Sequence, residues 1–231
     1  MKSIHRLALV SSVALLLGCQ PADPQPPATA AATDVDPAVP AQTAAVEDWT
    51  LPGEFAPDTT PEALRARFGE ANVRIVDDLP LAEGETTRGL ELFANDPTRR
   101  ALVYFQDEQR LRGLSAVAID DVQSRWRFAS GVQMGMTLDQ LVAVNGAPVT
   151  YYGLSWDYGG HVADWNGGKL ETVSGIPGRH IVRLAPAPDA AAEAYPEGDT
   201  EYRSDDKRWP AAGKALRVGE LVFNFPGQDD L

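Results

Sequence analysis

Three residues in the second half of the chain, Asp157, His161 and Asp164, could bind a metal ion. Imidazole nitrogen and carboxylate oxygen are both zinc ligands, and neighbouring strands could bring these groups together. Their spacing matches no dedicated zinc motif, however. We therefore expect no metal site and no cofactor, and we expect these aspartates, with Asp205 and Asp206, to form a solvated face.

A hydrolytic triad is the second chemistry to consider. Ser155 or Ser174 could act as nucleophile with His161 or His180 as base and an aspartate behind it. Nothing in the flanking sequence marks either serine. The chain also lacks a His-Glu-x-x-His segment, a nucleophile elbow, a phosphate loop and a dinucleotide glycine motif. We therefore predict that the protein is not an enzyme and has no catalytic residues.

A dense group of aromatic residues remains, and it has two interpretations. Some of these rings must fill the core of a small sheet. The others could contact a protein, because Tyr and Trp dominate interface hot spots, or could stack on a small molecule or a glycan. The candidate partner-binding residues are Tyr152, Trp156, Tyr158, His161 and Trp165.

The N-terminus has the pattern of an export signal. A basic segment, Met1–Arg6, precedes the apolar run Leu7–Leu17. This run is shorter than the roughly 20 apolar residues that span a bilayer, but it fits a signal peptide. It ends in Leu-Leu-Gly-Cys at residues 16–19, which resembles a bacterial lipobox. An ordinary secretory signal that happens to contain a cysteine is the alternative.

The lipobox resemblance implies that residues 1–18 are removed and that Cys19 is lipidated with diacylglyceryl and N-acyl (palmitate) chains. Gln20 follows instead of Asp, which in such lipoproteins favours the outer membrane. We therefore expect a lipid-anchored protein on the periplasmic face of the outer membrane. Cys19 is the only cysteine, so no disulfide can form.

A disordered tether is predicted over residues 19–47, which are rich in Ala and Pro and contain no Lys or Arg. Loss of residues 1–18 removes Lys2 and Arg6 and changes the formal net charge from −13 to −15. Such acidity argues against nucleic acid and against a basic patch for anionic lipid. It is consistent with simple solubility or with a basic partner.

Two helices are predicted by their capping signals. Thr137 is a suitable N-cap with Gln140 three residues later, and Gly146 followed by Pro148 ends the helix. The segment from Thr60 to Val73 aligns without gaps onto the segment beginning at Thr137. This internal similarity indicates a duplication, and the alternative is a chance likeness between two capped helices.

Strand-like runs follow each helix, so we predict an α+β fold of two tandem modules, each a short N-terminal helix packed on an antiparallel sheet. The modules span residues 48–127 and 128–231. In the second module we expect a strand over 150–158, a final strand over 216–225, and a disordered or loosely packed acidic loop over 185–213.

The pattern Gly-Met-Thr-x-x-Gln-Leu-x-x-x-x-Gly-x-Pro at residues 135–148 resembles small outer-membrane lipoproteins of the SmpA/OmlA (BamE) type. It also resembles the beta-lactamase inhibitor proteins, which carry two tandem helix-plus-sheet modules. Members of this wider group bind proteins, and in the tandem inhibitors a concave aromatic sheet contacts the partner. The resemblance therefore implies contact through Tyr152, Trp156, Tyr158 and Trp165. The length and acidity of this chain depart from the single-module lipoproteins, which puts a role in barrel assembly in doubt.

The predicted function is that of a periplasm-facing lipoprotein that binds an envelope protein or assists envelope assembly without catalysing a reaction. The alternative is a lipoprotein that binds a small molecule or glycan on the same aromatic sheet. A deep pocket ringed by Trp156, His161 and Trp165 would favour the alternative. A broad, shallow concave face would favour protein binding.

Overall fold

The computed structural model describes residues 49–171 and 179–226, and these residues belong to one compact unit. The predicted signal peptide, the lipidation site Cys19, the tether over 19–47 and the candidate nucleophile Ser174 lie outside the described residues.

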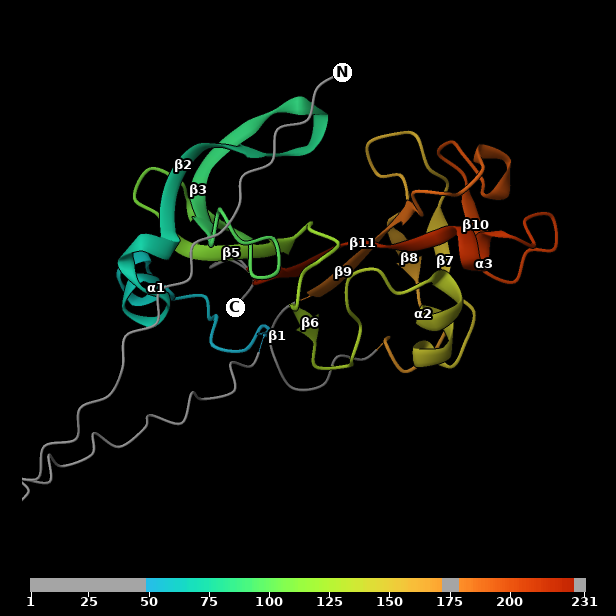
Figure 1. The fold of residues 1–231 in the computed structure, drawn as a ribbon, viewed down its shortest axis with the longest axis horizontal. Helices are drawn as coiled ribbons and strands as arrows, with labels where there is room; N and C mark the ends of the chain where they lie inside the picture. The colour runs from blue at the N-terminus through green and yellow to red at the C-terminus, as the bar shows by residue number, and fades with distance from the viewer. Residues whose placement is uncertain (1–48, 172–178, 227–231) are drawn as a thin grey trace, which may run out of the picture. The chain divides into compact units, whose positions relative to one another are not determined.

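A six-stranded antiparallel sheet dominates the fold (Figure 1). Its strands, in spatial order, are β2 (Val73–Pro80), β3 (Thr86–Leu92), β4 (Ala101–Asp107), β5 (Arg112–Ile119), β11 (Leu216–Asn224) and β9 (Arg179–Pro186).

The prediction of two tandem helix-on-sheet modules is wrong. Strand β11 from the second half of the chain pairs with β5 from the first half, with Phe223 opposite Val117. The described residues form three sheets of eleven strands in total and only three short α-helices, so the protein is mainly β. The physical reason is that β5 would otherwise end the first sheet as an unpaired edge carrying buried side chains, and β11 satisfies its backbone hydrogen bonds.

Two smaller sheets complete the β-structure. A three-stranded sheet has the order β10 (Glu201–Arg203), β7 (Thr150–Tyr152), β8 (Val162–Asp164). Strands β1 (Thr50–Leu51) and β6 (Arg127–Phe128) form a parallel pair.

The segment 185–213, expected to be disordered or loosely packed, is ordered instead. It contributes β10, the 3-10 turn η3 (Ala192–Ala194) and the start of α3 (Ala212–Ala215). Tyr195 and Ala212 are buried and anchor the segment to the core. Local composition predicted a loop. It could not show the order, because the contacts that fix this segment are with residues distant in the sequence.

The helix predictions are confirmed. Helix α1 (Pro61–Phe68) has Thr60 as N-cap, whose hydroxyl accepts a hydrogen bond from the Ala63 amide at 3.2 Å. Helix α2 (Leu138–Asn145) has the predicted capping box between Thr137 and Gln140, and Gly146 is left-handed. Two further 3-10 turns are η1 (Glu70–Asn72) and η2 (Ala82–Gly84).

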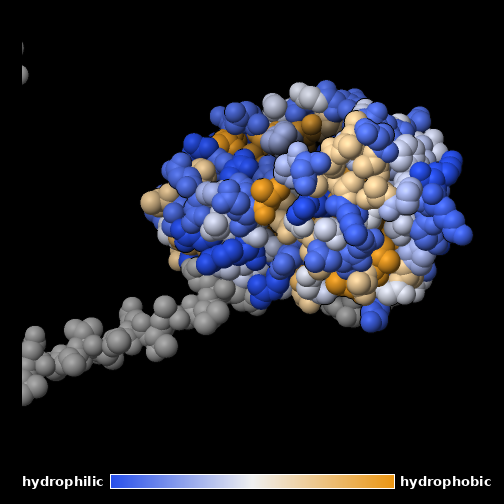
Figure 2. All heavy atoms as spheres, turned by 45° about the vertical axis from the view of Figure 1, so that its right-hand side comes forward, coloured by the Kyte–Doolittle hydropathy of each residue, from blue (hydrophilic) through white to orange (hydrophobic). Residues whose placement is uncertain are grey.

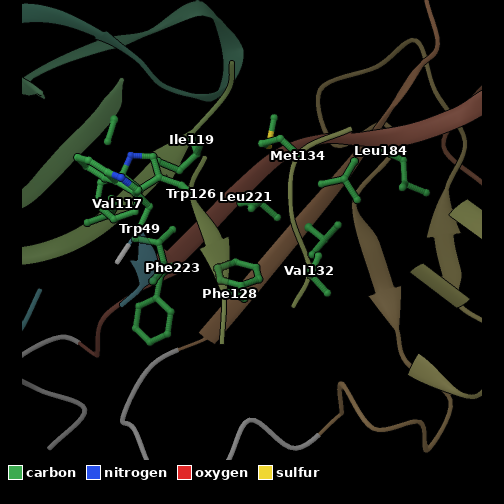
Figure 3. Packing of buried hydrophobic residues seen from close by; sticks show 14 of the residues in the cluster. Trp49, Val117, Ile119, Trp126, Phe128, Val132, Met134, Leu184, Leu221 and Phe223 are labelled. Atoms are coloured by element: carbon green, nitrogen blue, oxygen red, sulfur yellow. The ribbon is translucent and has the colours of Figure 1, made fainter. Parts of the chain in front are cut away.

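One continuous hydrophobic core joins the two halves of the chain (Figure 3). Val117 of β5 and Phe223 of β11 lie on the same face of the large sheet and are almost fully buried. Trp126 and Phe128 pack beside them from the segment that follows β5. The predicted inward alternation of Leu221, Phe223 and Phe225 is confirmed.

Candidate functional site

Four of the five predicted partner-binding residues come together in one aromatic cluster. The ring centroid of Trp156 lies 5.5 Å from that of Tyr152 and 5.5 Å from that of Tyr158. The Tyr158 and His161 centroids are 5.9 Å apart. Trp165 does not belong to this cluster, because it is half-buried and packs against the hydrophobic core.

A loop after β7 carries Trp156, Tyr158 and His161 of this cluster, and the predicted strand over 150–158 is wrong beyond Tyr152. Strand β7 ends at Tyr152. The chain then turns through Ser155 and Gly160, which both have positive φ, and a Cβ at Gly160 would lie 2.0 Å from the Leu184 carbonyl oxygen. The alternating aromatic pattern imitates a strand, but the glycines at 153, 159 and 160 allow a tight loop.

Side chain to backbone hydrogen bonds hold this loop in shape. The Trp156 Nε1–H donates to the Gly153 carbonyl oxygen at 2.9 Å. The His161 Nδ1 atom lies 2.9 Å from the Tyr158 carbonyl oxygen. The aromatic loop is therefore fixed at both ends, while the Tyr158 ring between them is 50% exposed.

An open groove of about 1030 Å³ extends from this loop across one face of the large sheet. Its floor contains a row of side chains in register on four adjacent strands. These are Leu102 of β4, Ala118 of β5, Val222 of β11 and Ile181 of β9. Leu102, Ala118 and the nearby Leu79 form a second apolar cluster, separate from the main core.

The groove has two walls from distant parts of the chain. One wall is the turn between β2 and β3, residues 80–84, and the other is the aromatic loop at residues 154–159. Only four large apolar side chains are exposed in the part of the chain that the structure describes, and two of them, Leu81 and Tyr158, lie on these walls. Figure 2 shows one face of the molecule, on which hydrophilic residues surround apolar residues that form separate patches.

Charges in the groove are mostly negative. The lining contains Glu83, Asp120, Asp157 and Glu220 against one arginine, Arg183. Arg100, outside the lining, donates to Asp120 at 2.7 Å. Glu220 has a weaker contact, because the Arg183 Nη1 atom is 3.9 Å from its carboxylate.

Burial raises the pKa of Glu220 above its usual range, and the neighbouring Asp120 acts in the same direction, while Arg183 and His161 oppose the shift. Burial also raises the pKa of Tyr104 to about 12, with contributions from Glu220 and Asp120. The neutral Tyr104 hydroxyl donates to the Pro80 carbonyl oxygen at 3.1 Å and so ties the β2–β3 turn to the floor.

The hydrolytic triad considered from the sequence is not assembled by the described residues. The Ser155 hydroxyl donates to Glu197 at 2.8 Å. The His180 ring stacks on Phe128 at a centroid distance of 4.1 Å, and its Nε2 atom is buried without a hydrogen-bond partner. Ser155 is therefore not activated by a histidine, and His180 is a half-buried residue that packs against Phe128.

A zinc site is not assembled either. Within residues 49–171 and 179–226, no three His, Cys, Asp or Glu side chains are grouped closely enough to hold a metal ion. Asp164 accepts a hydrogen bond from the Asn166 amide instead. Asp205 and Asp206 form ion pairs with Arg203 and Arg208.

Acid should destabilise the protein through His180. Burial lowers its pKa from 6.5 to about 4. Between pH 6.5 and pH 4, His180 is protonated in the unfolded chain but stays neutral in the folded chain. The free energy of unfolding should therefore fall by about 2–3 kcal/mol as the pH falls through this range. Urea denaturation at pH 7 and pH 4 measures this change. His180→Phe should reduce the pH dependence, and equal slopes for parent and variant would refute the assignment.

The floor and the β2–β3 wall of the groove were missed by sequence reasoning. Alternation in β4, β5 and β11 identified the core face only. The sequence contained a signal for the other face as well, because Leu102, Ala116, Ala118 and Val222 make it apolar and small where a solvated face would be polar. Nothing near Glu220 in the sequence marks it as a groove residue, because the residues that surround it come from other strands.

None of the described helices is long and apolar enough to cross a membrane. Comparison of the chain with protein-family models, with curated proteins and with solved structures found no match.

Proposed function

We propose that this chain is a lipid-anchored envelope protein, facing the periplasm at the outer membrane, that binds another protein in the groove without catalysing a reaction. The single observation that supports protein binding most strongly is the breadth of the groove. Its floor crosses four strands, and with about 4.8 Å between neighbouring strands it is about 14 Å wide. A helix or a hairpin loop of a partner, about 10–12 Å across for a helix, fits this width.

A small-molecule or glycan site has less support. Small ligands are held in pockets that bury most of their surface. Trp156 and His161 line the groove, but Trp165 does not, so these three side chains do not surround a common pocket. The exposed Tyr158 ring stands on an open wall, where it can contact a large partner.

The membrane anchor rests on the sequence of residues 16–19. Cys19→Ser should abolish lipidation, because serine offers no thiol for diacylglyceryl attachment. We expect the parent to incorporate labelled palmitate and to sediment with the outer membrane. The variant should lose the label and accumulate unprocessed or leave the membrane fraction. Equal labelling of parent and variant would contradict lipidation at Cys19.

Removal of one apolar side chain from each wall tests the groove. The full-length lipidated chain is cross-linked in cells of the organism that encodes it, and the attached proteins are quantified by mass spectrometry. Leu81→Ala and Tyr158→Ala should each reduce recovery of the same protein severalfold, since both remove exposed contact surface. Tyr158→Ala is preferable to Trp156→Ala because the Trp156 indole holds the loop through its hydrogen bond to Gly153.

Val122→Ala is the matched control. Val122 is 70% exposed and lies outside the groove, so its truncation should leave recovery unchanged. Circular dichroism and thermal melting establish that all three variants are folded. Unchanged recovery with both wall variants would reject the groove as the binding site. If no protein is recovered but the parent binds glycans or small metabolites in a thermal-shift screen, the small-ligand function replaces the proposal.

A further inference from the structure

We infer that the groove recognises a segment of the partner protein that presents a lysine or arginine side chain flanked by apolar side chains, and that Glu220 pairs with this cation. This inference rests on the proposed function and specifies the chemistry of the partner.

Glu220 is a half-buried carboxylate whose ion pair with Arg183 is long. Its side chain is only 28% exposed, on the groove floor. In the described part of the chain no group donates a hydrogen bond to it, and Arg183 approaches only to 3.9 Å. The Nε–H of Arg183 is engaged elsewhere, because it donates to the Gly159 carbonyl oxygen at 2.8 Å. A half-buried carboxylate that relies on solvent for its hydrogen bonds gains from a direct charge-assisted hydrogen bond, so a lysine or arginine head group would be stabilised there.

The other polar groups around Glu220 already have partners. Asp120 at the end of β5 is bound by Arg100. The Tyr104 hydroxyl of β4 donates to Pro80, and the His161 Nδ1 atom contacts the Tyr158 carbonyl. These groups and Arg183 are the titratable neighbours of Glu220. Glu220 is therefore the carboxylate on the floor whose ion pair is the longest, which leaves it able to pair with a cation of the partner.

The sign of the surrounding charge favours a cation. Four carboxylates line the groove against one arginine and one histidine, and the whole chain has a formal net charge of −13. Complementary charge speeds association and selects among partners. An acidic segment would be repelled, and the same repulsion disfavours phosphate groups and nucleic acid.

The walls suit the apolar part of such a segment. Leu81 is 45% exposed on one wall and Tyr158 is 50% exposed on the other. Lysine and arginine extend an apolar stem with a charged head, and the head can also interact with an aromatic face. The stem and its apolar neighbours would contact the walls while the head reaches Glu220.

A photo-cross-linking experiment identifies the segment. The photoreactive residue p-benzoylphenylalanine replaces Asp157, which is exposed in the groove lining, in the full-length lipidated chain expressed in its own organism. Mass spectrometry then maps the attached peptide. We expect a surface segment of one protein that contains Lys or Arg next to apolar residues.

Affinity measurements with that purified protein test Glu220 directly. Glu220→Gln should weaken binding about tenfold or more, since a charge-assisted hydrogen bond is lost. The matched control Glu193→Gln changes an exposed carboxylate outside the groove and should bind as the parent does. Higher salt should weaken the parent more than Glu220→Gln. Glu220→Lys should bind again when the partner's basic residue is replaced by Glu.

The outcomes separate the two proposals. If the mapped segment contains no basic residue, or if Glu220→Gln binds as tightly as Glu193→Gln, the inference fails while protein binding in the groove stands. If Asp157 yields no cross-link and the wall variants Leu81→Ala and Tyr158→Ala change nothing, the proposed function fails and the inference fails with it.

Discussion

Phe223→Ala is expected to lower the free energy of unfolding by about 3–5 kcal/mol, because truncation of a buried phenylalanine loses burial and leaves a cavity. Phe223 is 1% exposed and lies opposite Val117 on the neighbouring strand. Its ring is 4.9 Å from that of Phe225 and 5.0 Å from that of His180. A loss of this size is a large part of the 5–15 kcal/mol that stabilises a typical domain.

Because the two halves of the chain share one sheet, Phe223→Ala should also affect strands of both halves. Because β11 pairs with β5 and with β9, weakening β11 should destabilise strands from both halves of the chain together. Urea denaturation followed by hydrogen exchange should show equal loss of protection in β4, β5, β9 and β11. Val122→Ala is the control, since Val122 is exposed. Loss confined to residues 128–226 would instead indicate two independent modules.

Glu91→Ala is expected to cost about 2–3 kcal/mol. Glu91 is 7% exposed on β3 and accepts hydrogen bonds from Arg74 and Arg100. Its removal leaves Arg100, whose side chain is 29% exposed, with Asp120 as its remaining ion-pair partner. Removal of one partner of a buried ion pair is destabilising because the remaining charge is less well compensated. The expected loss is smaller than for a fully buried ion pair because the Arg74 side chain is 64% exposed and can be solvated.

The pH dependence gives this prediction a second readout. Burial acts to raise the pKa of Glu91, but hydrogen bonds from Arg100 and Arg74 outweigh it and lower the pKa below the usual 4.5. The stabilisation is therefore present above pH 4.5 and is lost as pH falls through the lower, folded-state pKa. Thermal unfolding of Glu91→Ala should show less of this acid loss than the parent. A change no larger than that of the exposed Glu193→Ala would contradict the role of Glu91.

Local signals were sufficient to predict the helices and several strands from the sequence. Thr60 and Thr137 are side-chain caps followed by good helix formers, and both helices form as expected. Alternation in the final strand correctly placed Leu221 and Phe223 in the core. Each of these signals depends on residues within a few positions of one another, which is why they can be read without the fold.

Long-range pairing was beyond the reach of the sequence. The apparent duplication suggested that each half would close its own sheet, but β11 is shared by β5 and β9. Any strand of suitable length can supply the backbone hydrogen bonds that an edge strand lacks, and the sequence does not specify which strand does so. The same limit hid the groove, whose floor combines β4 and β5 from the first half of the chain with β9 and β11 from the second half.

For the aromatic residues, the sequence predicted the grouping correctly and the local backbone structure wrongly. Composition identified Tyr152, Trp156, Tyr158 and His161 as a group, and the structure brings their rings together. Their setting was predicted wrongly, because the strand expected over 150–158 ends at Tyr152.

Binding of the cross-linked partner to a Leu81→Ala, Tyr158→Ala double variant tests the groove most directly, because it removes apolar contact from both walls at once. The affinity of the purified full-length variant is compared with that of the parent and of Val122→Ala after circular dichroism has verified folding. We predict a loss of tenfold or more for the double variant, which corresponds to about 1.4 kcal/mol or more, and no change for Val122→Ala. An affinity equal to that of the parent would contradict binding in the groove.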